Sequence, residues 1–218
     1  MPPPRRARLA RALLRRSVLI HDRLHRTLVF RLGRAIYGVH PKNVFNHRWP
    51  FFARHVEKTD VVLDVACGTG SILSRIADRI GRGVGIDVDP GFAREWAAAC
   101  SAGPLEFRVV DFTAVDFAAL RTEVPYDVAI FSHILEHVGD VPALLIRVGA
   151  PRVLICVPSV ESWYEDLRRA LGITELRDPT HHREYTRAML ADELERAGYR
   201  VTEMGFNGEG EIVCRADR

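Results

Sequence analysis

The residues most able to do chemistry lie in the segment "FSHILEHVGD", where His133, Glu136 and His137 follow the order H-x-x-E-H. Two imidazoles and a carboxylate at this spacing can bind Zn²⁺ and activate a water molecule when one helix carries both histidines. A further imidazole, His182, follows in "DPTHHREYT". Which chemistry these groups perform depends on the elements that position them.

The chain from residue 60 onward alternates short apolar runs with helix-like stretches. Apolar runs of strand length between helices are typical of a doubly wound α/β fold, with helices on both faces of a mostly parallel sheet. Strands are expected at residues 61–66, 83–88, 106–110, 127–132 and 152–157, and helices at 71–80, 91–101, 114–121 and 140–148. A helix at 186–198 and two closing strands, "YRVTEMGF" and "GEIVCRA", would bring the sheet to seven strands.

This arrangement excludes a zinc peptidase. A peptidase of that kind needs both histidines inside a long helix, but here the motif starts directly at the end of the fourth strand and Gly139 interrupts it. The H-x-x-E-H segment therefore lies at the carboxyl edge of the sheet, where doubly wound folds bind their ligands.

The charge of the chain is unevenly distributed. The net charge is +3, yet residues 1–40 hold ten arginines and one acid, which gives +9 and leaves 3 − 9 = −6 for the rest. Leu9, Leu13, Leu24 and Leu28 recur at helical spacing among these arginines, which predicts one or two basic amphipathic helices. Their apolar side could pack on the body, or the segment could bind an anionic membrane or nucleic acid.

The bulk properties indicate one domain with an N-terminal extension. We expect a basic helical cap over residues 1–55 and a ligand-binding domain over 56–218. The four cysteines are far apart and no apolar run reaches the roughly 20 residues of a membrane span. We therefore expect free thiols and a cytoplasmic protein, with peripheral contact of residues 5–34 to the anionic inner face of the membrane as one role for the arginines. The oligomeric state is not indicated.

The glycine turn "DVACGTG" after the first strand predicts a nucleoside site. Gly68 and Gly70 allow a sharp turn, and the following helix directs its N-terminus at the same point. Asp64 before the glycines would repel a pyrophosphate but attract a cation, while Asp87 at the end of the second strand can accept hydrogen bonds from a ribose. Leu73 replaces the third glycine of a dinucleotide fingerprint, so the ligand is expected to be a cationic nucleoside.

With "GVGIDVDP" and "VVDF" following in order, the chain resembles the class I S-adenosylmethionine-dependent methyltransferases over residues 56–218. The resemblance implies a Rossmann-like fold, methyl transfer, and S-adenosylmethionine as the cofactor. It also implies Asp87 on the ribose, Val88 against the adenine, Asp111 near the adenine amino group and the amide of Phe112 near a ring nitrogen. The cofactor site that we predict comprises Asp64, Ala66, Gly68, Gly70, Asp87, Val88, Asp111, Phe112 and Ser132.

In the resembled family the "ILEHV" position forms the floor of the acceptor pocket, and a subset with E-x-x-E-H binds a divalent metal there. This sequence has His133 in place of the first glutamate. Three roles therefore stay open: a metal site drawn from His133, Glu136, His137 and His182, a general base among the histidines, or a structural pocket floor. We take His133, His137 and His182 as the catalytic candidates, and we favour a base over a metal.

A base is most useful for a hydroxyl acceptor, which favours O-methylation. Two flanking segments, "YGVHPKNVFNHRWPFF" and the chain from residue 175 to 201, are similar to methyltransferases of bacterial surface-polysaccharide assembly, which implies a glycan or small-molecule hydroxyl. Two alternatives remain. The basic arm could hold RNA as the substrate, although the body is acidic, or the domain could be a catalytically silent partner subunit.

Overall fold

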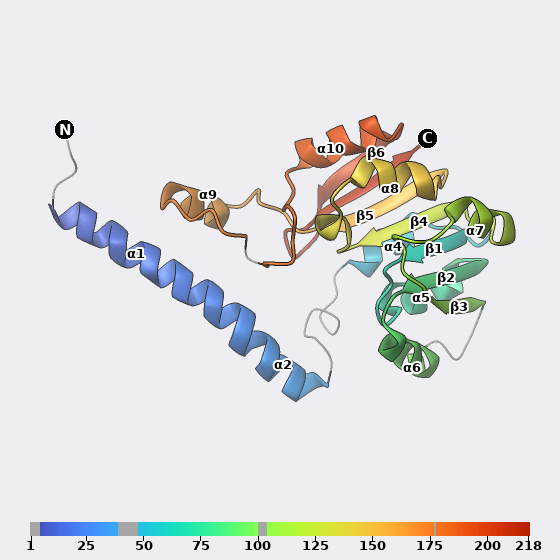
Figure 1. The fold of residues 1–218 in the computed structure, drawn as a ribbon, viewed down its shortest axis with the longest axis horizontal. Coiled ribbons are helices and arrows are strands. Elements are labelled where there is room, and N and C mark those ends of the chain that lie inside the picture. Colours follow the sequence, from blue (N-terminus) through green and yellow to red (C-terminus); the bar gives the residue numbers. More distant parts are fainter. Residues whose placement is uncertain (1–4, 39–47, 100–103, 177) are drawn as a thin grey trace. The chain divides into compact units, whose positions relative to one another are not determined.

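The structure is a computed structural model that describes residues 5–38, 48–99, 104–176 and 178–218. The chain forms two compact units (Figure 1). Unit 1 comprises residues 1–46 and 160–181, and unit 2 comprises residues 47–159 and 182–218. By packing, a segment after the fifth strand thus joins the N-terminal segment, whereas the sequence suggested one boundary near residue 55. That suggested boundary stays a prediction about domain organisation.

Unit 2 is built on a seven-stranded sheet with the order β3-β2-β1-β4-β5-β7-β6. All pairs from β3 to β5 are parallel, and β7 pairs antiparallel with both β5 and β6. The predicted doubly wound, mostly parallel seven-stranded sheet is therefore confirmed. The strands are β1 (Val61–Val65), β2 (Arg82–Asp87), β3 (Leu105–Val109), β4 (Val128–Ser132), β5 (Arg152–Val157), β6 (Arg200–Phe206) and β7 (Ile212–Asp217).

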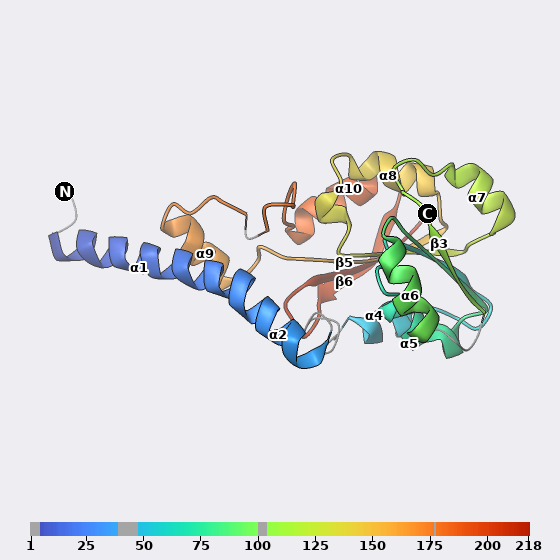
Figure 2. The ribbon, with the colours of Figure 1, turned by 60° about the horizontal axis from the view of Figure 1, so that its bottom comes forward.

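Helices cover both faces of this sheet, as its buried and largely apolar central strands β1, β4 and β5 require (Figure 2). One face packs against α7 (Phe117–Glu123), α8 (Val141–Val148) and α10 (Arg187–Arg196). The other face packs against α4 (Trp49–Arg54), α5 (Ser71–Ile76) and α6 (Pro90–Ala99), and a short 3-10 turn, η2 (Ala77–Arg79), follows α5. The chain crosses from one face to the other after β3, so the sheet winds in opposite directions from β1.

The helix starts follow local capping chemistry. Asp116 accepts hydrogen bonds from the amides of Ala118 and Ala119 at the start of α7, and Asp140 does the same for Ala143 in α8. A carboxylate at this position satisfies amides that have no partner inside the helix. The helix predicted from residue 114 therefore begins at residue 117, because Asp116 has an extended backbone and caps the first turn with its side chain.

The regular structure that is described in unit 1 is helical. It comprises α1 (Arg5–Leu24), a π-helical turn η1 (His25–Val29), α2 (Phe30–Tyr37) and α9 (Trp163–Ala170). The predicted basic helices of the arm are thus present, and α2 ends at Gly38 in the left-handed conformation. None of the described helices is long and apolar enough to cross a membrane.

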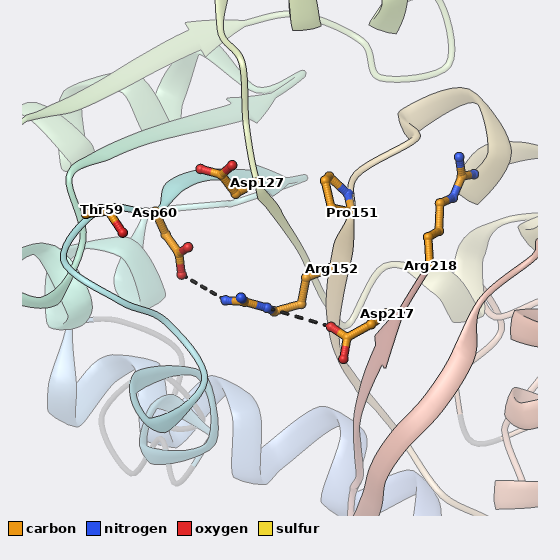
Figure 3. Close-up of a pocket in the computed structure, with 7 residues that line it drawn as sticks. All are labelled: Thr59, Asp60, Asp127, Pro151, Arg152, Asp217 and Arg218. Atoms are coloured by element: carbon orange, nitrogen blue, oxygen red, sulfur yellow. Dashed lines mark hydrogen bonds and ion pairs between the residues drawn. The ribbon is translucent and has the colours of Figure 1, made fainter.

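An ion-pair clamp closes the amino edge of the sheet in unit 2 (Figure 3). Arg152, the first residue of β5, donates from Nη1 to Asp60 Oδ2 at 2.9 Å and to the carbonyl of His55 at 3.0 Å. Its Nε also lies 3.7 Å from Asp217 Oδ1 at the end of β7. A cavity of about 440 Å³ opens beside the clamp, at the sheet edge opposite the glycine turn. Its lining residues are Thr59, Asp60, Asp127, Pro151, Arg152, Asp217 and Arg218.

We expect Arg152→Met to lower the free energy of unfolding by about 2 to 3 kcal/mol, because Asp60 would stay buried without its cation. Urea unfolding followed by circular dichroism measures this loss. Arg196→Met is the matched control, since Arg196 forms an exposed i, i+4 pair with Asp192 and should cost no more than about 0.5 kcal/mol. Equal losses of unfolding free energy in Arg152→Met and Arg196→Met would contradict a stabilising role for the ion pairs of Arg152.

Candidate functional site

The carboxyl ends of β1, β2 and β4 meet at one edge of the sheet, and the glycine turn lies there. Gly68 and Gly70 adopt φ values of +55° and +70°, a region that side chains disfavour. At Gly70 a Cβ atom would lie 1.9 Å from the ring of Trp96, so only glycine fits between the turn and α6. The turn therefore keeps its backbone open toward the sheet edge.

Asp87 fixes this turn to the end of β2. Its Oδ2 accepts a hydrogen bond from the amide of Gly68 at 2.8 Å, and its Oδ1 accepts one from Asp89 at 3.0 Å. The residue that follows, Val88, is 64% exposed and offers an apolar surface to a flat ring. The carboxylate predicted to hold a ribose thus also braces the glycine turn, which the sequence did not indicate.

Asp64 is a buried acid with an unused oxygen. It is only 1% exposed, and its Oδ2 has no hydrogen-bond partner among the described residues. Burial, together with the charge of Asp87, raises the pKa of Asp64 to about 8. A cationic ligand would satisfy this oxygen and favour the ionised form, so the site fits a cofactor that carries ammonium and sulfonium groups.

The other predicted cofactor residues lie at the same edge. Ser132 is the last residue of β4, and Asp111 and Phe112 lie two and three residues after the end of β3. Asp111 Oδ1 accepts hydrogen bonds from the amide and the hydroxyl of Thr113, which lower its pKa. The edge thus brings together all nine predicted cofactor positions, although their roles toward the cofactor stay predictions.

Two residues at this edge have strained backbones. Ala66, at the end of β1, and His133, at the end of β4, both adopt φ of +57°, and they are the only described non-glycine residues with positive φ. A left-handed conformation costs roughly 1–2 kcal/mol for a residue with a Cβ atom. Such strain is typical of functional sites, because the surrounding structure must hold it in place.

His133 lies between two buried carboxylates. Its Nε2 is 2.7 Å from Glu211 Oε1 and its Nδ1 is 3.3 Å from Glu136 Oε1. Glu136 is fully buried and neither of its oxygens has an aligned hydrogen-bond donor among the described residues. Burial by itself would lower the pKa of His133, but its contacts with these two negative charges raise the pKa overall.

Glu211, which the sequence reading missed, anchors this cluster. It accepts a hydrogen bond from Asn207 Nδ2 at 2.8 Å, and its Oε2 lies 3.8 Å from Nε of the buried Arg48. Burial would raise its pKa, yet His133, Arg48 and Asn207 hold it at about 2. An acid directly before the apolar strand "IVCRA" was the available signal, but only the antiparallel pairing of β7 with β5 brings it to this edge.

The other two histidine candidates lie beside Glu136, and a ring nitrogen of His137 is within 4.8 Å of a Glu136 carboxylate oxygen. His137 ends the 3-10 turn η3 (Leu135–His137) and is half-buried. The amide of His182 donates to the carbonyl of Glu136 at 2.8 Å, but the residue itself is exposed. The structure thus groups His133 and Glu136 with Glu211, while it joins His182 to the cluster through its backbone.

A second possible use of the cluster is metal binding. His133, Cys156 and Glu211 offer ligand atoms that all lie within 4.8 Å of one another. This set shares only His133 with the metal ligands proposed from the sequence. Burial and the charge of Glu211 raise the pKa of the Cys156 thiol well above its usual range, so a metal would have to displace the thiol proton in order to bind there. The metal role suggested for His133, Glu136, His137 and His182 stays a prediction.

The comparisons with known proteins agree with this geometry. A family model described as a methyltransferase domain matches residues 38–204. The chain therefore belongs to the methyltransferase family that its motifs resemble, with S-adenosylmethionine as the cofactor and methyl transfer as the class of reaction. A search of the curated proteins finds no match.

Solved structures show the same fold at low sequence identity. Magnesium protoporphyrin IX methyltransferase from Synechocystis is 16% identical over 92% of this chain and 99% of its own, with a TM-score of 0.61. A methyltransferase from Aquifex aeolicus is 16% identical over 84% of this chain and 92% of its own, with a TM-score of 0.59. An O-methyltransferase family 2 protein from Planctomyces limnophilus, in complex with apigenin, is 19% identical with a TM-score of 0.61; the match covers 78% of this chain but only 57% of that longer protein.

We expect Ala66→Gly to raise the free energy of unfolding by up to about 1 kcal/mol. Glycine removes the left-handed strain at φ +57°, although its freedom in the unfolded chain offsets part of the gain. Ala143→Gly is the control, because Ala143 lies exposed in α8 and should lose about 0.5–1 kcal/mol. Thermal unfolding measures both, and a loss of stability in Ala66→Gly would refute the strain.

We also expect the affinity for S-adenosylmethionine to rise with pH up to about pH 8. Below its raised pKa the Asp64 carboxyl is protonated, so binding a cation must release that proton. Below pH 8, the Kd should fall by a factor that approaches ten for each unit by which the pH is raised. Calorimetric titrations of the wild type and Asp64→Asn measure it.

The Asp64→Asn variant reports any titration that belongs to the ligand itself, including its own amino group. The difference between the two proteins is the contribution of Asp64. A difference that stays constant from pH 6 to pH 8 would show that Asp64 does not exchange a proton on binding.

Proposed function

We propose that this methyltransferase transfers the methyl group to a hydroxyl oxygen of a small molecule or a glycan. When bound, S-adenosylmethionine supplies a methyl group that is already activated by the positive sulfur. The protein then has to hold the acceptor in line at about 3 Å and remove the hydroxyl proton. The observation that carries the proposal is the imidazole of His133, held between Glu136 and Glu211 at the end of β4.

The surroundings of His133 suit proton removal. Glu136 lies at Nδ1 and Glu211 lies at Nε2, so both ring nitrogens face a carboxylate. To act as the base, His133 must exchange its contact with Glu211 for the acceptor hydroxyl at Nε2. The neutral imidazole then accepts the hydroxyl proton at Nε2, and Glu136 at Nδ1 stabilises the imidazolium that results. His133 is also the more exposed of the three groups, since its side chain retains 17% of its surface. A hydroxyl acceptor uses such a base, whereas a neutral amine does not require one.

The acceptor class rests on weaker support. One similar structure is an O-methyltransferase family 2 protein in complex with apigenin, and another is a magnesium protoporphyrin IX methyltransferase. These names favour small-molecule acceptors, while the resemblance to polysaccharide-associated enzymes favours a sugar hydroxyl. Part of that second resemblance, residues 39–47, lies outside the described residues. We further propose a cytoplasmic location, because Cys67, Cys156 and Cys214 are free thiols; Cys100 also lies outside the described part of the chain.

A panel of glycans, phenols and RNA, assayed for methyl transfer from labelled S-adenosylmethionine, identifies the acceptor. We expect turnover on a hydroxyl compound. Turnover on RNA alone would replace the proposal with the nucleic-acid alternative. Cofactor binding without turnover on any acceptor would favour a catalytically silent subunit.

With the acceptor in hand, we expect kcat/KM to rise with pH through a value above 6.5, because the raised pKa of His133 must be exceeded before its imidazole is neutral. Glu211→Gln should move this rise to lower pH, since one of the two charges that raise the pKa is removed. His133→Gln should abolish the rise and reduce kcat by roughly 10²- to 10⁴-fold.

Glu203→Gln is the matched control. Glu203 lies on β6 and pairs with Arg54 and His55, outside the His133 cluster, so its pH profile should equal that of the wild type. An unmoved profile in Glu211→Gln, with normal folding, would mean that His133 is not the base.

A further inference from the structure

The basic N-terminal segment, residues 5–38, exposes an unusual amount of apolar surface. Seventeen large apolar side chains are exposed among the described residues, and ten of them lie in this segment. Soluble proteins rarely gather exposed apolar groups in one place without a binding role. The ten residues are Leu9, Leu13, Leu14, Ile20, Leu24, Leu28, Val29, Leu32, Ile36 and Tyr37.

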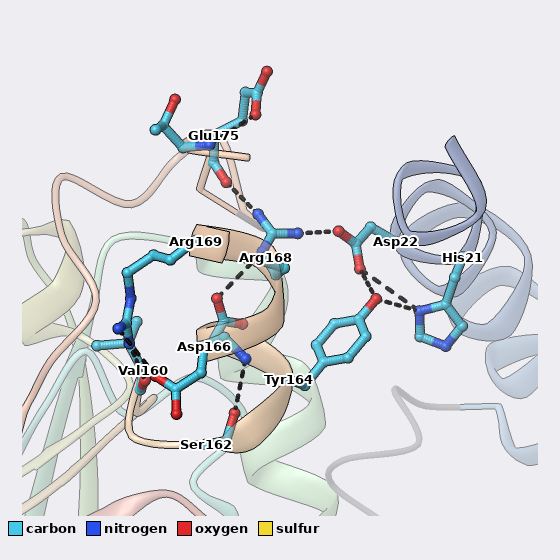
Figure 4. Close-up of polar contacts among 11 residues, drawn as sticks. His21, Asp22, Val160, Ser162, Tyr164, Asp166, Arg168, Arg169 and Glu175 are labelled. Atoms are coloured by element: carbon cyan, nitrogen blue, oxygen red, sulfur yellow. Dashed lines mark hydrogen bonds and ion pairs between the residues drawn. The ribbon is translucent and has the colours of Figure 1, made fainter. Parts of the chain in front are cut away.

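One face of α1 already has a partner inside unit 1 (Figure 4). Val18 is buried with Leu171 and Ile173, which follow α9. One turn further along, Asp22 accepts a hydrogen bond from the hydroxyl of Tyr164 at 2.7 Å and forms an ion pair with Arg168. This face attaches α1 to α9. The only acidic residue of the basic segment, Asp22, is bound by Tyr164 and Arg168 and lies on this face.

The opposite face of α1 carries an apolar stripe. Leu9, Leu13, Ile20 and Leu24 follow the spacing i, i+4, i+11 and i+15, which places them on one side of a helix. Leu9 and Val18 are nine residues apart, or about 180° around the axis at 3.6 residues per turn. The four stripe residues are 47–62% exposed. The four leucines that the sequence placed on one helical face, Leu9, Leu13, Leu24 and Leu28, are all exposed.

Arginines border this stripe. Arg6, Arg16 and Arg23 each lie three or four positions from a stripe residue and are exposed. Long arginine side chains can keep their charge in water while their stems lie along an apolar surface. The exposed side of α1 is therefore apolar along its centre and cationic along its edge, with Asp22 turned to the other face.

We propose that this face of α1 docks on an anionic lipid surface and lies in the plane of the interface. An amphipathic helix of this kind buries its apolar stripe at the level of the headgroups, while each arginine near the surface strengthens binding about fivefold. A phosphate backbone would match the arginines but leave the leucines in water. A second copy of α1 would bury the leucines but set arginines against arginines. Anionic lipid matches both features.

Co-sedimentation of the full chain with vesicles tests this docking. We expect binding to vesicles of phosphatidylcholine with 30–50% phosphatidylglycerol, little binding to phosphatidylcholine alone, and weaker binding as salt rises. The double variant Leu13→Glu, Ile20→Glu should weaken binding at least tenfold, and so should Arg16→Glu, Arg23→Glu. These positions are exposed, so the variants should unfold at the wild-type temperature.

Ile146→Glu is the matched control, because Ile146 is an exposed apolar residue of α8 in unit 2. It should bind vesicles as the wild type does. Absent vesicle binding, equal binding to neutral vesicles, or unchanged binding in the stripe variant would overturn the proposal. A dimer in sedimentation velocity that the stripe variant dissociates, without vesicle binding, would assign the face to a second copy. RNA binding without vesicle binding would assign it to nucleic acid.

Discussion

The constraint on which this protein depends is the burial of negative charge at one edge of its sheet. Asp64, Asp87, Glu136 and Glu211 are all buried there, and a buried carboxylate is costly unless it is paired or protonated. Asp87 accepts hydrogen bonds from two backbone amides. Glu211 pairs with His133 and Arg48 and accepts a hydrogen bond from Asn207. Asp64 keeps an oxygen without a partner and has a raised pKa. The unpartnered oxygen of Asp64 thus offers a place for a cation, while the carboxylates of Glu136 and Glu211 offer a place for the proton of His133.

The same edge holds the backbone strain of the fold. Ala66 and His133 both occupy the left-handed region, each at the point where a buried strand of unit 2 ends. Pairing of β1 with β2 and β4, and of β4 with β5, fixes the chain just before each residue. The paired strands can therefore hold the left-handed backbone of Ala66 and His133, which an isolated loop would not keep. The fixed backbone of His133 directs its ring toward Glu136 and Glu211.

In unit 1 the main constraint is the attachment of a strongly basic helix, α1, to the α9 region. A helix rich in arginine gains little from burial, yet Val18 and Asp22 tie α1 to the α9 region through one apolar contact and one charge network. Because Asp22 is used in this way, the remaining surface of α1 carries its arginines without a compensating acid of the same segment. The cationic and apolar character of that surface follows from how the helix is held within its own unit.

The sheet and the glycine turn were predictable from the sequence, because strand length, apolar runs and turn residues are local properties. The class of cofactor followed from the resemblance of the motifs. The sequence also marked His133 and Glu136 through their spacing. The contact of Glu211 with His133, and of Arg48 with Glu211, could not be predicted in this way, since it depends on the antiparallel return of β7 and on the start of α4, which lie far apart in the chain. Only the tertiary structure decided which side of α1 is covered, because helical periodicity shows that a stripe exists but not which stripe finds a partner.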